Sequence, residues 1–139
     1  MLDTSGYSAM QRHHPQIQQA LEAASEIHVS PVVLGELLSG FRGGVRRVHN
    51  EKELYAFLDQ PIVRVAQVNA ETAERYAEIA DGLRAAGTPI PTNDMWIAAG
   101  AMEHGLRVIT TDAHFQRVPQ VLVECYAAKA KLQNEANSG

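Results

Sequence analysis

Residues 26–41, EIHVSPVVLGELLSGF, contain the two kinds of secondary structure from which the fold is predicted. Residues 26–29 read as a short strand. The Ser30-Pro31 pair that follows is a strong helix start, because a serine side chain caps the first turn and proline fits the first helical position. After Pro31, apolar residues recur at helical spacings. A strand that leads directly into a helix is typical of a parallel sheet covered by helices.

The same alternation continues on both sides of this stretch. Helices are predicted over residues 6–13, 15–24, 31–41, 45–58, 69–87 and 93–104, and strands over residues 26–29, 62–68, 106–110 and 121–124, with Met1-Leu2 as barely a strand. Asn69 and Thr92 are expected to cap helices, and Gly105 to end one. The pattern predicts one α/β domain over residues 1–126, a three-layer α/β/α fold with a central, mainly parallel sheet. The tail over residues 127–139 is expected to be helical or disordered.

Length and composition exclude several classes of protein. The 139 residues are enough for a genuine hydrophobic core. The formal net charge of −4 argues against a protein that coats nucleic acid, although it does not exclude a nuclease. Apolar stretches are far shorter than the ~20 residues of a membrane span, and no signal-peptide pattern opens the chain, so a cytoplasmic protein without membrane partners is expected. Cys125, the only cysteine, excludes an internal disulfide and a cysteine-based zinc site.

Three carboxylates stand where predicted elements end or begin, and a fourth lies within a predicted helix. Asp3 directly follows the first strand and Asp112 follows the strand that ends at Thr110, and open parallel sheets place ligands at the carboxyl ends of their strands. Asp94 lies in the first turn of a helix. Each of these three also has an ordinary structural explanation, as a cap, a turn residue or a partner of the helix dipole. Glu36 lies mid-helix among apolar residues and is the hardest to explain without a partner or a metal.

Together the four side chains predict a particular chemistry. They are hard oxygen donors, which is the ligand type of Mg²⁺ or Mn²⁺ rather than Zn²⁺. Crowded carboxylates repel one another, so the metal-free site should be strained and a bound ion should relieve the strain. Such an ion lowers the pKa of a water molecule and neutralises charge on a phosphoryl transition state. The residues therefore predict a Mg²⁺ site, with Mn²⁺ as an alternative, that hydrolyses a phosphodiester with a metal-activated water.

Four segments in this order resemble the PIN-domain ribonucleases, in particular the VapC toxins of type II toxin–antitoxin systems. They are DTS (residues 3–5), SPVVLGELL (residues 30–38), PTNDMWIAA (residues 91–99) and VITTDAHF (residues 108–115). The resemblance covers nearly the whole chain and implies a PIN-like fold.

The resemblance also assigns residue roles, substrate and partners. It implies that Thr110 supports the metal site and that Ser5 orients Asp3. The acidic metal-binding set that it implies consists of Asp3, Glu36, Asp94 and Asp112. It further implies an RNA substrate, a homodimer, and an antitoxin whose peptide fills the site and presents an arginine to the acids.

Other residues are open to two interpretations. The cluster of Arg42, Arg46 and Arg47 is either a patch that holds RNA phosphates or an ordinary solvated helix start. Trp96 is expected to pack in the core rather than stack on bases, because it points away from Asp94 around the helix. His114 is close enough in sequence to reach the site, but no role follows from the pattern.

Three other classes of protein remain as alternatives. A receiver-type signalling domain also binds Mg²⁺ at strand ends, but it needs a lysine after a late strand, and Lys52, Lys129 and Lys131 do not stand there. A PIN nuclease of RNA processing would carry the same residues as a toxin. A non-catalytic binding module would not need all four carboxylates.

Overall fold

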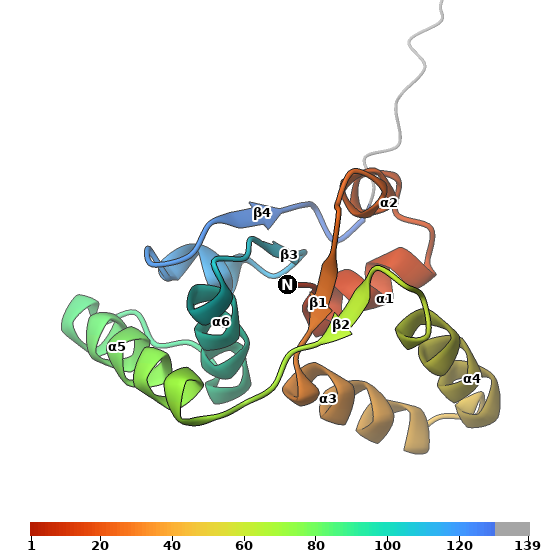
Figure 1. The fold of residues 1–139 in the computed structure, drawn as a ribbon, viewed down its shortest axis with the longest axis horizontal. Helices are drawn as coiled ribbons and strands as arrows, with labels where there is room; N and C mark the ends of the chain where they lie inside the picture. The colour runs from red at the N-terminus through yellow and green to blue at the C-terminus, as the bar shows by residue number, and fades with distance from the viewer. Residues whose placement is uncertain (130–139) are drawn as a thin grey trace, which may run out of the picture.

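The computed structural model describes residues 1–129, in which helices and short strands alternate (Figure 1). The helices are α1 (Thr4–Gln11), α2 (Pro15–Glu22), α3 (Pro31–Arg42), α4 (Arg47–Leu58), α5 (Ala70–Ala86), α6 (Thr92–His104) and the 3-10 helix η1 (Ala113–Arg117). The strands are β1 (Ile27–Val29), β2 (Val63–Val65), β3 (Val108–Thr110) and β4 (Val123–Cys125). Each predicted helix and strand is present, and the strands are shorter than predicted. The predicted tail lies outside the described residues from residue 130 onward.

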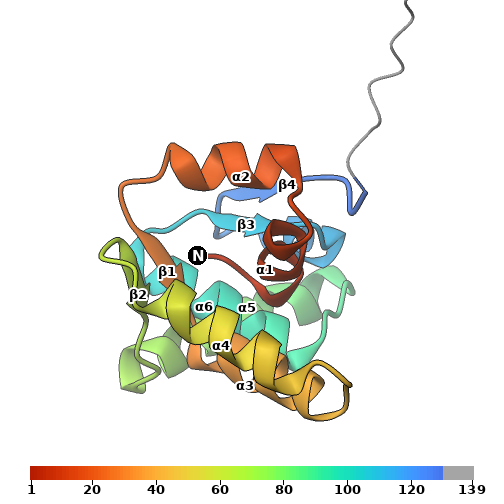
Figure 2. The same ribbon diagram turned by 90° about the vertical axis from the view of Figure 1, so that its right-hand side faces the viewer.

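The chain's first residues join two pairs of strands into one sheet. β1 pairs in parallel with β2, and β3 pairs in parallel with β4. Leu2 donates its amide hydrogen to the His28 carbonyl at 2.9 Å on one side and forms a parallel bridge with Ile109 on the other. The Ile109 amide in turn donates to the Met1 carbonyl at 2.8 Å. The order is therefore β2, β1, residues 1–3, β3, β4, and both views place the N-terminus between β1 and β3 (Figure 1 and Figure 2).

Helices cover both faces of this sheet. Figure 1 shows α1 and α2 on one side of the strands and α5 and α6 on the other, while α3 and α4 extend from the β2 side. Leu2, Val29 and Val108 from the strands are buried, as are Ile79 of α5 and Ile97 of α6. The predicted three-layer arrangement around a mainly parallel sheet is confirmed. No helix within the described residues is long and apolar enough to cross a membrane.

Helix caps follow the sequence signals at most positions. The Ser30 hydroxyl accepts the Val32 amide at 3.2 Å, and Asn69 forms a reciprocal capping box with Thr72. Gly105 ends α6 in the left-handed conformation. The expectation for Thr92 was wrong, because Pro91 occupies the cap position without a side-chain hydrogen bond and Thr92 is already helical. An extended proline backbone can start a helix without a cap, since proline fixes φ near the required value.

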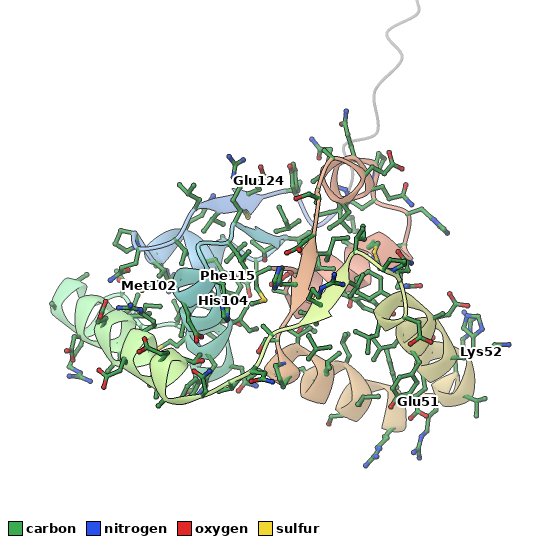
Figure 3. The ribbon with its side chains drawn as sticks, in the orientation of Figure 1. Glu51, Lys52, Met102, His104, Phe115 and Glu124 are labelled. Atoms are coloured by element: carbon green, nitrogen blue, oxygen red, sulfur yellow. The ribbon has the colours of Figure 1, made fainter. Side chains whose placement is uncertain are left out.

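Packing orients the residues around the carboxyl ends of the strands. Phe115 of η1 is fully buried, and Figure 3 shows it in the interior beside α6. Burying such a side chain contributes about 1.5–3 kcal/mol, which holds η1 in place. On the other side of α6, Trp96 is half-buried and stacks on Tyr76 of α5, with ring centroids 4.2 Å apart. Trp96 therefore packs against a neighbouring helix at the margin of the core rather than within it.

The close approach of α1 to β3 depends on Gly6. A Cβ atom at this position would lie 2.6 Å from the Ile109 carbonyl oxygen and 2.7 Å from a Leu2 methyl carbon. We expect Gly6→Ala to lower the free energy of unfolding by about 1–3 kcal/mol, because the backbone of β3 cannot move away without disturbing the sheet. Urea denaturation measures the change.

Gly40→Ala is the matched control. Gly40 is also helical, in α3, but a Cβ there would have no neighbour within 4 Å. This substitution should leave the protein as stable or raise its stability by about 0.5–1 kcal/mol, since alanine favours helix more than glycine does. Equal effects of the two substitutions would contradict the packing argument.

Candidate active site

The four carboxylates predicted from the sequence come together at the carboxyl edge of the sheet. Asp3 ends the central segment, Asp112 follows β3, Asp94 lies in the first turn of α6, and Glu36 comes from α3. Burial raises the pKa of Asp94 to about 6, and the negative charges of Asp112, Asp3 and Glu36 add to the increase. His114 acts in the opposite direction. Asp94 therefore lies within electrostatic reach of all three other acids.

Asp3 is the most buried of these acids and is held by a dense set of hydrogen bonds. It is 3% exposed. Its Oδ1 accepts the Gly6 amide at 2.7 Å, its Oδ2 accepts the Thr110 hydroxyl at 2.7 Å, and the Ser5 hydroxyl lies 3.0 and 2.9 Å from the two oxygens. Burial raises the pKa of Asp3, while these three donors lower it and the charge of Asp112 raises it further. Asp3 is thus both a helix cap and a member of the acidic cluster.

Two hydroxyl groups connect Asp3 to the backbone after β3. The Thr111 amide donates to Ser5 Oγ at 3.0 Å, and the Asp112 amide donates to Thr110 Oγ1 at 2.8 Å. Each hydroxyl accepts from the backbone on one side and contacts the Asp3 carboxylate on the other. The position of Asp112 is therefore coupled to that of Asp3 through hydrogen bonds of normal length.

Glu36 has a partner that the sequence did not indicate. Thr4 Oγ1 donates to Glu36 Oε1 at 2.8 Å, which ties the first residue of α1 to the middle of α3. The side chain of Glu36 is only half-buried, so the ordinary explanation of a helix face with a solvent-exposed edge also fits its surroundings. A contact across this distance along the chain leaves no trace in local sequence periodicity.

His114 is the residue of this site to which the sequence assigned no role. Its Nδ1 lies 2.9 Å from Asp112 Oδ1 and 3.7 Å from Asp94 Oδ2. The candidate ligand atoms of these three residues all lie within 4.8 Å of one another, close enough to contact a single ion. Nδ1 is also a buried atom without a hydrogen-bond partner in the described part of the chain. A polar atom enclosed without a partner is costly, and a divalent cation at this position would satisfy it.

The three arginines lie apart from the acids. Arg42 ends α3, and Arg46 and Arg47 stand at the start of α4. All three are exposed, and Arg47 pairs with Glu51 at 2.8 Å. Figure 3 shows Glu51 on α4, at the outer end of the α3–α4 pair. Arg42 follows Glu36 by ~9 Å along the axis of α3, so the arginines flank the site rather than line it.

Cys125 lies beside this site on β4, opposite Thr110 in the strand register. Burial raises the pKa of the Cys125 thiol, and the charges of Asp112 and Asp3 raise it further. A thiol with a raised pKa is a poor nucleophile.

Comparison with known protein families identifies the family to which this fold and acidic cluster belong. The model of the PIN-domain family matches residues 1–121. Because this match takes in most of the chain, the chain belongs to the PIN-domain family. The receiver-type alternative is therefore set aside.

Individual relatives narrow the family to its VapC branch. The chain is 34% identical to Ribonuclease VapC4 of Mycobacterium tuberculosis over 107 residues, 73% of this chain and 78% of the relative. It is 30% identical to Ribonuclease VapC1 of Rickettsia felis over 135 residues, 93% of this chain and 97% of the relative. The structure of VapBC2 from Rickettsia felis, bound to a DNA fragment from its promoter, is similar with a TM-score of 0.79 and 26% identity, and covers 90% of this chain and 96% of that chain. The predicted resemblance is confirmed.

The crowding of the acids predicts how stability of the metal-free protein depends on pH. The pKa of Asp94 is about 6 in the folded protein and about 3.9 in an unfolded chain. Between these values the folded state binds more protons than the unfolded state, so the free energy of unfolding falls as pH rises. We expect metal-free wild type to lose about 2 kcal/mol between pH 4 and pH 7 through this group. Thermal denaturation in chelator measures the loss.

Asp94→Asn provides the comparison, because it removes the charge and nearly keeps the shape. The variant should be more stable than wild type at pH 7 in chelator, and its stability should depend less on pH. Mg²⁺ at a hundredfold excess over its Kd should stabilise wild type by about 2.7 kcal/mol. If neither Asp94→Asn nor Mg²⁺ changed the melting temperature, the acids would not repel one another in solution.

Proposed function

We propose that this protein is a metal-dependent endoribonuclease that acts as the toxin of a toxin–antitoxin pair. The observation that supports the proposal is the meeting of four carboxylates at one edge of the sheet with the enclosed Nδ1 of His114, which forms no hydrogen bond within residues 1–129. That donor set supports metal binding, and the relatives, which are named as ribonucleases, support RNA as the substrate.

In this proposal, Asp3, Glu36, Asp94 and Asp112 hold the ion, taken to be Mg²⁺ with Mn²⁺ as an alternative. The bound ion supplies Lewis acidity to the scissile phosphate and acidifies the attacking water. The protein positions the ligands in advance, because three of the acids come from rigid elements and Asp3 is fixed by its hydrogen bonds. Ligands held in place in this way need little reorganisation during the reaction.

Thr110 and Ser5 are proposed as positioning residues rather than ligands. Both of their hydroxyl groups are engaged with the Asp3 carboxylate on one side and with backbone amides on the other. Loss of either hydroxyl would leave the buried carboxylate of Asp3 with fewer hydrogen-bond donors. Partners of this kind affect metal affinity by about 10–100-fold in known metal sites.

The RNA backbone is proposed to extend from the acids towards the arginines. Arg42, Arg46 and Arg47 are exposed and offer guanidinium groups to phosphates on that side of the scissile bond. Because the arginines lie away from the acids along α3, the ion rather than an arginine contacts the scissile phosphate in this proposal.

An antitoxin partner and a homodimer complete the proposal. Similar solved structures include VapBC2 from Rickettsia felis and VapBC-5 from Mycobacterium tuberculosis, the latter described as a member of a family of toxin–antitoxin systems. A cluster of acids with raised pKa values is a favourable site for an arginine presented by a partner peptide. The alternative is a PIN nuclease of RNA processing, which would use the same site without an antitoxin.

Cleavage of RNA tests the enzymatic part of the proposal. Purified protein should cleave structured RNAs with Mg²⁺ or Mn²⁺ and should not cleave them in chelator. Asp94→Asn should reduce the rate by about 100-fold or more, because loss of even an outer-shell partner can cost up to that factor. Gel analysis of labelled RNA measures the rate.

Asp81→Asn is the matched control for this experiment. Asp81 is an exposed carboxylate on α5 that pairs with Arg84 at 3.3 Å, so its loss should leave cleavage unchanged. Cleavage by Asp94→Asn at the wild-type rate would rule out the assignment of the site.

Growth of cells that express the protein tests the toxin role separately. Expression of wild type should arrest growth, and expression of Asp94→Asn should not, because the acid is needed for cleavage. If a small antitoxin-like protein is encoded beside it, co-expression of that protein should restore growth. Active cleavage in the test tube without any growth defect would favour the RNA-processing alternative.

A further inference from the structure

His114 is held in the acidic cluster by its neighbours on both sides. Phe115, which follows it, is fully buried, and Asp112, which precedes η1, accepts the His114 backbone amide at 2.9 Å. These contacts fix the backbone of His114 beside the carboxylates. This places its Nδ1 between Asp112 Oδ1, at 2.9 Å, and Asp94 Oδ2, at 3.7 Å.

The surroundings of this nitrogen do not fit an ordinary hydrogen bond. Histidine beside a carboxylate usually donates a proton to it, but Nδ1 of His114 is enclosed and has no hydrogen-bond partner within residues 1–129, in spite of its short distance to Asp112. A buried nitrogen in this state costs free energy unless something else satisfies it. The nitrogen and one carboxylate oxygen from each of Asp94 and Asp112 instead lie within 4.8 Å of one another.

The spacing of these atoms fits an ion. In an octahedral site with bonds of about 2.1 Å, adjacent ligand atoms lie roughly 3.0 Å apart and opposite ones roughly 4.2 Å apart. The distance of 2.9 Å between Nδ1 and Asp112 Oδ1 corresponds to adjacent ligands, and the distance of 3.7 Å to Asp94 Oδ2 lies between the two cases. Both distances are short enough for the atoms to contact one ion.

We propose that Nδ1 of His114 is itself a ligand of the divalent ion, together with Asp94 and Asp112, and that the site therefore prefers Mn²⁺ to Mg²⁺. This inference rests on the proposed function. Mg²⁺ takes oxygen ligands almost exclusively, whereas imidazole nitrogen binds first-row transition ions well. A mixed set of one nitrogen and several carboxylate oxygens consequently shifts the selectivity towards the transition ion.

The test uses Mn²⁺ bound to the full-length protein and does not depend on activity. Pulsed electron paramagnetic resonance detects the nuclear coupling of a nitrogen that is directly bonded to Mn²⁺. Wild type should show this coupling, and labelling of histidine with ¹⁵N should change it to the ¹⁵N pattern. His114→Ala and His114→Gln should both lose it, and circular dichroism checks that each variant is folded.

Affinities measured by calorimetry provide the second readout. His114→Ala should bind Mn²⁺ at least about tenfold more weakly than wild type, with a smaller change for Mg²⁺, so that the preference between the ions narrows. His49→Ala is the matched control, because His49 is exposed on α4 and belongs to no acidic cluster in the described residues. It should retain the nitrogen coupling and both affinities.

The outcomes separate the inference from the function on which it rests. Stoichiometric Mn²⁺ binding that Asp112→Asn abolishes, without nitrogen coupling and with wild-type affinities in His114→Ala, would overturn the role of His114 and leave the metal-dependent nuclease standing. If wild type bound neither ion, the proposed function itself would fail.

Discussion

The carboxylate of Asp3 is buried at the carboxyl end of the central segment of the sheet, and its hydrogen bonds with Gly6, Ser5 and Thr110 hold the site together. The bond to Thr110 joins residues 107 positions apart in the chain. It connects the start of α1 to the end of β3, and the same hydroxyl receives the Asp112 amide. A buried carboxylate without these donors would cost several kcal/mol, so the fold around the sheet edge and the arrangement of the site are stabilised by the same contacts.

The electrostatics of the site follow from this constraint. Asp3 cannot move away from Asp112, and α6 brings Asp94 to the same place, so like charges accumulate in a partly desolvated volume. The protein retains this unfavourable arrangement because core packing, such as that of Phe115 and Ile97, fixes the elements that carry the acids. Strain stored in this way is relieved by a cation, which couples stability to metal binding.

Local signals in the sequence predicted most of the elements for identifiable reasons. Ser30-Pro31 and the Asn69 capping box act within one helical turn, so their effect is visible in neighbouring residues. The strands were predicted too long because only three residues of each make the required pairings, and pairing depends on the partner strand. Thr92 was taken for a cap from its residue type, whereas the backbone of Pro91 already determines the start of α6.

By itself, the sequence determined the order of strands and helices along the chain and the resemblance to the PIN-domain family. It also determined that the candidate ligands are carboxylate oxygens, those of Asp3, Glu36, Asp94 and Asp112. Only the tertiary structure decided that residues 1–3 form the middle of the sheet, that Thr4 holds Glu36, and that His114 turns an enclosed nitrogen towards two of the acids. The physical reason is the distance along the chain over which each interaction acts. Propensity and capping act between neighbours in the chain, whereas sheet pairing, charge crowding and ligand geometry act between groups that are close only after the chain has folded.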